Sequence, residues 1–196
     1  QIYNFSTQWH ATKVTSKYQS LVSYFNLKVE NEKLKDENAG LLKKLFLQSS
    51  FDVDTSSLDS LKSRINIISA TIIDNSVAKR NNMITLDKGI LDGVDVGMGV
   101  VSSNGVVGII TDVSDHFSLV MSLLHSKSRI SCQLPHCGFF GTLVWNGLDP
   151  NILQLEDIQR YADVRKGDSI VTSGYSIVFP KNILVGTVKD FTVESG

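Results

Sequence analysis

Apolar residues recur every seven positions in the first quarter of the chain, which is the period of a coiled-coil helix. The frame comprises Tyr24, Leu27, Asn31, Leu34, Asn38, Leu41 and Leu45. Leucine at one core position and asparagine at the other is typical of a parallel two-stranded coiled coil. We predict a dimer seam in which the leucines pack and Asn31 and Asn38 set the register. The helix is expected over about 14–47, within a coiled-coil segment 1–48.

The same helix has an alternative interpretation, in which its apolar face packs on its own domain. Several features favour a seam that is real but weak. Apolar residues between 14 and 25 lie one position out of phase with the frame, so a phase slip or fraying is expected there. Gly40 costs about 1 kcal/mol at an exposed helix site. In a parallel pair, Glu30 of one chain would face Lys35 of the other.

The chain changes character after this helix. Of the 14 glycines only Gly40 precedes residue 89, and all three prolines lie in the last third. The polar stretch "QSSFDVDTSSLDS" (48–60) separates the two parts, and it contains good helix N-cap residues. We therefore predict a linker or a short helix over 49–64.

Short β-branched runs separated by turn residues predict an all-β remainder over 65–196. The strand candidates are 65–74, 83–86, 99–110 (two strands), 117–124, 128–134, 141–145, 169–173 and 184–193. The dipeptide Asn104-Gly105 predicts a hairpin turn, because both residues tolerate positive φ. No helices alternate with these strands, which favours small barrels or sandwiches over a parallel sheet. We expect two β subdomains with a boundary near 111–118, and a segment from about 160 that returns to the first.

Two strand-turn-strand units also resemble each other in sequence. Residues 96–110 and 166–188 share a plan of glycine, strand, a Ser/Gly turn, Val-Gly and a second strand. This similarity fits two small β subdomains or two corners of one pseudo-symmetric barrel.

Charge and hydropathy exclude some classes of function. Nineteen basic and 20 acidic residues leave a net charge of −1, which argues against a general nucleic-acid binder. No apolar run is long enough to cross a bilayer, and no signal-peptide pattern is present. The chain begins at Gln1 rather than methionine, so we expect a fragment from which a targeting segment was removed.

Gly167-Asp168-Ser169 matches the start of the sequence around the nucleophile of trypsin-like proteases. Such proteases continue with glycines that let backbone N–H groups face the oxyanion, whereas here β-branched residues follow. The candidate bases are His10, His116, His125 and His136, and none lies in a recognisable protease context. We interpret Ser169 as a strand residue and keep a trypsin-like barrel hydrolase as the alternative.

Cys132, His136 and Cys137 form one local cluster, "CQLPHC". Zinc sites usually add a second pair of ligands at a distance, and none is evident here. The cysteines are therefore interpreted as half-buried strand residues, with a small metal or redox module as the alternative and a disulfide left open. No phosphate-binding loop or carboxylate pair stands out, and no cofactor, metal or catalytic residue is predicted.

The loop "GYSIVFP" (174–180) holds four large apolar residues: Tyr175, Ile177, Val178 and Phe179. Such residues either close the end of a small barrel or form an exposed contact patch. We name them as candidate partner contacts and keep barrel capping as the alternative.

Taken together, several segments resemble the rod shape-determining protein MreC family in its extracytoplasmic region. They are 81–110, 118–131, 139–147 and "VRKGDSIVTSGYSIVFPKNILVGTV" (164–188), preceded by a heptad arm. The resemblance implies two β-barrel-like domains after the coiled coil, one of them similar to a trypsin barrel without its triad.

The resemblance also implies a function and a location. It implies a non-enzymatic scaffold of cell-wall elongation that maintains cell shape. Its partners would be MreB, MreD, RodA and the elongation-specific penicillin-binding protein, besides a second copy of itself. The protein would lie on the periplasmic or extracytoplasmic side of the inner membrane, held by a single-pass anchor outside this chain.

Overall fold

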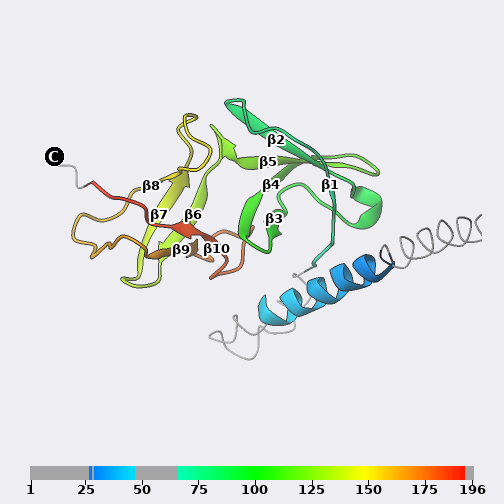
Figure 1. Cartoon of the computed structure of the whole chain (residues 1–196), viewed down its shortest axis with the longest axis horizontal. Helices are drawn as coiled ribbons and strands as arrows, with labels where there is room; N and C mark the ends of the chain where they lie inside the picture. Colours follow the sequence, from blue (N-terminus) through cyan, green and yellow to red (C-terminus); the bar gives the residue numbers. More distant parts are fainter. Residues whose placement is uncertain (1–26, 28, 47–65, 193–196) are drawn as a thin grey trace, which may run out of the picture.

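The structure is a computed structural model that describes residues 27, 29–46 and 66–192. Residues 29–46 form a helix beside a mainly β body (Figure 1). The strands are β1 Ile72–Asn75, β2 Asn81–Leu86, β3 Gly99–Ser102, β4 Gly105–Val113, β5 Ser118–His125, β6 Ile130–Leu134, β7 Phe139–Val144, β8 Gln154–Glu156, β9 Ser169–Thr172 and β10 Leu184–Thr187, with a 3-10 turn η2 at Ile90–Asp92.

The strands form two curled antiparallel sheets of five strands each. The first has the order β1-β2-β5-β4-β3 and the second the order β10-β9-β6-β7-β8. Figure 1 shows the two sheets side by side, each bent like half a barrel. The prediction of a mainly β fold is confirmed, and β8 is the strand that the sequence pattern missed.

The sheets change at residues 126–129, between the end of β5 and the start of β6. The predicted boundary near 111–118 instead falls on the β4–β5 hairpin, where Val113 pairs with Ser118. A tight antiparallel hairpin keeps both strands in one sheet, so the first sheet continues through that range. The segment after residue 160 adds β9 and β10 to the second sheet, and β10 also contacts β4 of the first.

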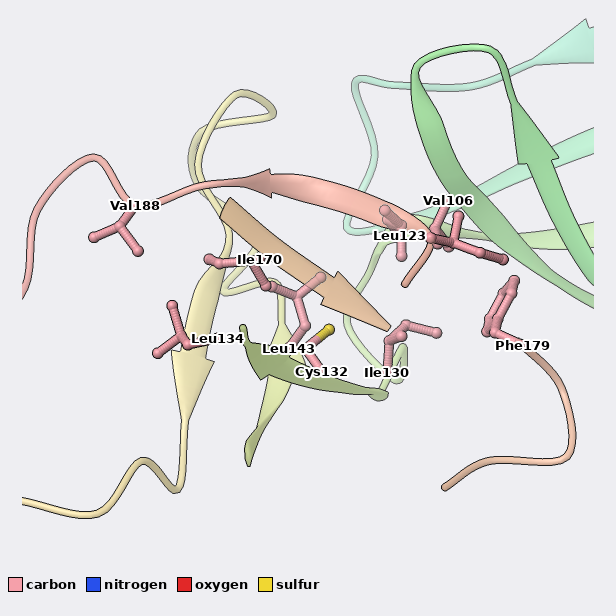
Figure 2. Close-up of a cluster of buried hydrophobic side chains, with 10 residues drawn as sticks. Val106, Leu123, Ile130, Cys132, Leu134, Leu143, Ile170, Phe179 and Val188 are labelled. Atoms are coloured by element: carbon pink, nitrogen blue, oxygen red, sulfur yellow. The ribbon is translucent and has the colours of Figure 1, made fainter. Parts of the chain in front are cut away.

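One hydrophobic cluster joins the two sheets. Figure 2 shows Val106 and Leu123 of the first sheet beside residues of the second sheet and its loops. Phe179, from the loop between β9 and β10, belongs to the same cluster and is 4% exposed. Each fully buried apolar side chain of this size contributes about 1.5–3 kcal/mol, so the shared cluster holds the sheets together. A smaller hydrophobic cluster around Val120 packs on the first sheet.

The two units that resemble each other in sequence also share a hydrogen-bond pattern. Gly97 donates to the Ile110 carbonyl at 2.8 Å, and Gly167 donates to the Val188 carbonyl at 2.8 Å. Both glycines have φ of 90° in a turn. The strand pairs then follow the same register, with a bulge at the same step: Gly99–Ile109, Val100–Gly108 and Val101–Val106 in one unit, Ser169–Thr187, Ile170–Gly186 and Val171–Leu184 in the other. The internal similarity predicted from the sequence is therefore a structural repeat.

The predicted hairpin at Asn104-Gly105 is confirmed as a hairpin, with one difference. Ser102 pairs with Gly105, so the two loop residues are Ser103 and Asn104. Gly105 opens β4 with φ of 129°, and Asn104 does not have positive φ. Gly105 is required because β4 passes close to Leu184 of β10 at this point.

The helix contacts the body through one side. Ala39, Leu42, Lys43 and Phe46 are half-buried, and Phe46 packs against the larger cluster. Lys35 Nζ donates to Thr71 Oγ1 at 3.3 Å. A long coiled coil is not shown: most of the predicted segment 1–48, including Tyr24 and His10, lies outside the described residues, as does the predicted linker 49–64.

Candidate interaction surfaces

The leucines of the predicted seam form an exposed stripe on the described helix. Leu27, Leu34, Leu41 and Leu45 are 52–66% exposed, and the intervening Asn31 and Asn38 are exposed as well. The half-buried side of the helix lies roughly a third of a turn away, since residues advance about 100° each. The leucine stripe is therefore not the side of the helix that packs on its own domain.

Of the two charged residues predicted to face each other across the seam, Lys35 makes a hydrogen bond to Thr71 within its own chain, and the pairing of Glu30 stays a prediction. Glu30 is exposed, and on the same helix Lys33 lies 3.8 Å from Glu37 at i,i+4 spacing. Exposed pairs of this kind contribute only a few tenths of a kcal/mol, so they do not determine how the helix associates.

The loop between β9 and β10 divides its apolar residues between core and surface. Tyr175 is 75% exposed and Ile177 is fully exposed. Val178 is half-buried. Phe179 is buried against Gly99, where an added Cβ would lie 2.4 Å from the ring. Phe179 therefore packs in the core, as in the barrel-capping interpretation, and a partner contact stays a prediction for Tyr175, Ile177 and the half-buried Val178.

Hydrogen bonds fix the base of this loop. Thr172 Oγ1 donates to the Pro180 carbonyl and accepts the Ile183 N–H at 2.9 Å. At the tip, the Tyr175 ring lies 4.7 Å from the Phe140 ring of β7, in a tilted arrangement. Phe140 is itself partly exposed, so the two rings and Ile177 offer an aromatic and aliphatic surface on a held loop.

Ser169 opens β9 as an exposed strand residue paired with Thr187. Asp168 accepts the Arg165 N–H through Oδ2 at 2.9 Å, which closes the turn before the strand. Within the described ranges, no hydrogen bond links Ser169 to a histidine. The resemblance of Gly167-Asp168-Ser169 to a protease motif thus reflects a turn and a strand, and the geometry gives no support to the hydrolase alternative.

His125 lies in the other sheet, at the end of β5. Its Nδ1 accepts the Lys127 N–H at 3.0 Å, so the neutral ring fits this position. Burial, with a smaller effect of the Lys127 charge, lowers the pKa of His125. These contacts give His125 a structural role in the turn after β5.

Both cysteines are free thiols. Cys132 is fully buried in β6, and burial raises the pKa of its thiol to about 12. Cys137 is half-buried, with its Sγ 4.0 Å from the Leu134 carbonyl. No group of three metal-ligating side chains occurs among residues 27, 29–46 and 66–192. The arrangement therefore gives no support to a metal or redox module at Cys132, His136 and Cys137.

A cavity of about 240 Å³ lies where the two sheets meet. Its lining comes from β4, β6, β7 and the loop after β9, with Arg129 at its edge. The sequence analysis missed this site, because its residues are far apart along the chain and form no local motif. No helix in the described part of the chain is both long enough and apolar enough to cross a membrane.

Comparison with known proteins relates both the sequence and the fold of this chain to one family. Residues 72–196 match the family model described as rod shape-determining protein MreC, barrel core. Cell shape-determining protein MreC of Escherichia coli is 26% identical over 90% of the chain, and that of Listeria monocytogenes is 29% identical over 62% of it. The crystal structure of MreC from Pseudomonas aeruginosa superposes with a TM-score of 0.63 at 30% identity, covering 67% of this chain and 84% of that one.

The chain spans 49% of the Escherichia coli relative and 42% of the Listeria relative. The resemblance inferred from the sequence is confirmed over the β part, where the family match, the two sheets and the superposed structure coincide. The chain belongs to the family of the rod shape-determining protein MreC.

Proposed function

We propose that the protein is a non-enzymatic scaffold of the bacterial cell-wall elongation machinery, which maintains cell shape. Its relatives are named cell shape-determining proteins, which supports a role in the maintenance of cell shape. In this proposal the helix pairs two copies, and the β body presents surfaces to the enzymes of peptidoglycan synthesis. The partners proposed from the family resemblance are MreB, MreD, RodA and an elongation-specific penicillin-binding protein.

The observation that carries the proposal is the exposed leucine stripe on the helix. One side of the helix already packs on the β body, yet Leu34 remains 52% exposed and Leu41 56%. Regular leucines at heptad spacing on a surface helix favour a second helix as their partner. A parallel pair would orient both β bodies in the same direction, as expected for a spacer between a membrane anchor outside this chain and the extracytoplasmic machinery.

The structure allows the contribution of one seam residue to be estimated. Complete burial of a leucine contributes about 1.5–3 kcal/mol, and about half of the Leu34 surface is still available. Burial of Leu34 in both copies would then contribute about 2 kcal/mol, which corresponds to roughly 30-fold in the dimer dissociation constant. A glutamate at this position would also bring two like charges together.

Sedimentation equilibrium on the 196-residue chain tests the seam, with Leu34→Glu as the perturbing variant. Val29→Glu is the matched control, since Val29 is 66% exposed on the same helix but outside the heptad core. We expect a concentration-dependent dimer that Leu34→Glu weakens at least roughly 30-fold and Val29→Glu leaves unchanged. Monomers of the parent chain at all concentrations would contradict the seam. A dimer that survives Leu34→Glu would move the interface to the β body.

In the second part of the proposal, the loop surface formed by Tyr175, Ile177 and Phe140 contacts a partner. Tyrosine and large aliphatic side chains on a held loop lose little conformational entropy on binding, which suits them to the centre of an interface. The hydrogen bonds of Thr172 hold the base of this loop. Ile177→Ser should reduce partner binding without changing the stability of the fold, because Ile177 makes no buried contact.

A further inference from the structure

The cavity between the two sheets has an apolar floor. Ile109 of β4, Ile130 of β6 and Phe179 of the loop line it. Figure 2 shows Ile130 and Phe179 away from the end of the cluster that holds Leu134 and Val188. The floor therefore belongs to the junction of the sheets, and the fixed loop base holds Phe179 there.

Arg129 lies at the edge of this cavity, and one of its three guanidinium nitrogens makes hydrogen bonds within the described residues. Nη1 donates to the carbonyls of Ser128 at 2.8 Å and Ser126 at 3.2 Å, which anchors the side chain. In the described part of the chain, Nε and Nη2 have no acceptor and Arg129 has no carboxylate partner. The Nε–Nη2 edge of the guanidinium is therefore free, cationic and held in place. Because Arg129 is exposed, this edge of the cavity is open to solvent.

Three residues with hydroxyl groups line the rest of the cavity: Ser131, Thr142 and Ser176. Ser131 and Thr142 are partners across β6 and β7, so their side chains lie next to each other. Ser131 Oγ accepts a bond from Ser173 Oγ at 2.8 Å, and Ser176 Oγ accepts the Val178 N–H at 3.1 Å.

Ser131 and Ser176 act as acceptors in these bonds, and no hydrogen bond of the Thr142 hydroxyl occurs within the described residues, so all three hydroxyl protons are available for a ligand. A serine or threonine hydroxyl has one proton to donate, and no described acceptor takes the proton of Ser131, Thr142 or Ser176. Each of the three hydroxyls can therefore donate a hydrogen bond to a ligand, and the free edge of Arg129 adds two cationic N–H donors. Such a set selects an anion that accepts several hydrogen bonds.

We propose that this cavity binds the C-terminal carboxylate of a short peptide whose last residue has a small apolar side chain. A planar carboxylate matches the two parallel N–H groups of a guanidinium edge, and one arginine neutralises one carboxylate. The apolar floor contacts the terminal side chain. A cavity of about 240 Å³ lies below the usual range for whole ligands, so it holds one residue while the rest of the peptide extends into solvent.

The test uses the isotope-labelled 196-residue chain and two probes, N-acetyl-Ala-Ala and its C-terminal amide. In an NMR titration we expect saturable shifts of the Ser131, Thr142 and Ser176 amide signals with the acid. Binding of the amide should be at least roughly tenfold weaker, because the charge-assisted bonds to Arg129 are lost. Equal binding of acid and amide, or no saturable shift with the acid, would overturn the proposal.

Variants separate recognition from folding. Arg129→Gln should weaken acid binding at least roughly tenfold, and Thr142→Val should weaken it several-fold with little change in shape. Arg165→Gln is the control, since Arg165 is an exposed arginine that bonds Asp163 away from the cavity. Inorganic phosphate serves as a further probe, and tighter binding of phosphate than of the peptide acid would overturn the peptide assignment. The cavity does not include the helix, so failure here would leave the proposed dimer seam standing.

Discussion

Gly105 lies at a close approach between the two sheets, and its replacement by alanine tests whether they form one body. Gly105 opens β4 with φ of 129°, a backbone conformation that costs a residue with a side chain about 1–3 kcal/mol. An added Cβ would also lie 2.2 Å from the Leu184 carbonyl oxygen of β10. Relief of such a backbone contact requires the sheets to shift, at about 1–3 kcal/mol more.

Gly105→Ala should therefore reduce the free energy of unfolding by about 2–6 kcal/mol, a large part of the stability of a typical domain. Urea unfolding of the whole chain measures the loss, and in a Trp9→Phe background the fluorescence of the buried Trp145 is a probe of the second sheet. Circular dichroism follows both sheets together. Coincident transitions by the two probes are expected if the sheets unfold as one unit.

Two other glycines serve as graded controls. Gly97 has φ of 90° but open space around its Cβ position, so Gly97→Ala should cost only the backbone strain of about 1–2 kcal/mol. Gly186 has neither positive φ nor a close neighbour, so Gly186→Ala should change stability by about 0.5 kcal/mol or less. A loss for Gly105→Ala no greater than that for Gly97→Ala would refute the close approach of β4 and β10.

Two further predictions concern titratable side chains. Burial lowers the pKa of His125, so as the pH falls below about 6.5 the unfolded chain takes up a proton that the folded chain resists, and stability decreases. His125→Asn should flatten this part of the pH dependence of urea unfolding, and an identical slope in the variant would contradict the argument. Burial raises the pKa of the Cys132 thiol to about 12, so at pH 8 a thiol reagent should label Cys137 in the folded chain and both cysteines only in urea. Equal labelling of both thiols in the folded chain would show that Cys132 is accessible.

The sequence alone determined the local structure of the β part. Alternation of apolar residues and the positions of turn residues predicted nine of the strand segments and the hairpin near Gly105, because these features depend on neighbours along the chain. The repeat of 96–110 in 166–188 was also visible in the sequence, since the same turn glycines recur in both units. The short β8 was missed because three residues at a sheet edge carry too little pattern.

Only the tertiary structure decided which apolar side chains are buried and which are exposed. Ile177 and Phe179 are near neighbours in one loop, yet one is fully exposed and the other buried, and only the contact with Gly99 distinguishes them. The sheet boundary at 126–129 and the cavity beside Arg129 likewise arise from contacts between distant strands. Periodicity along a chain specifies which side chains share a face, but the partner of that face comes from long-range packing.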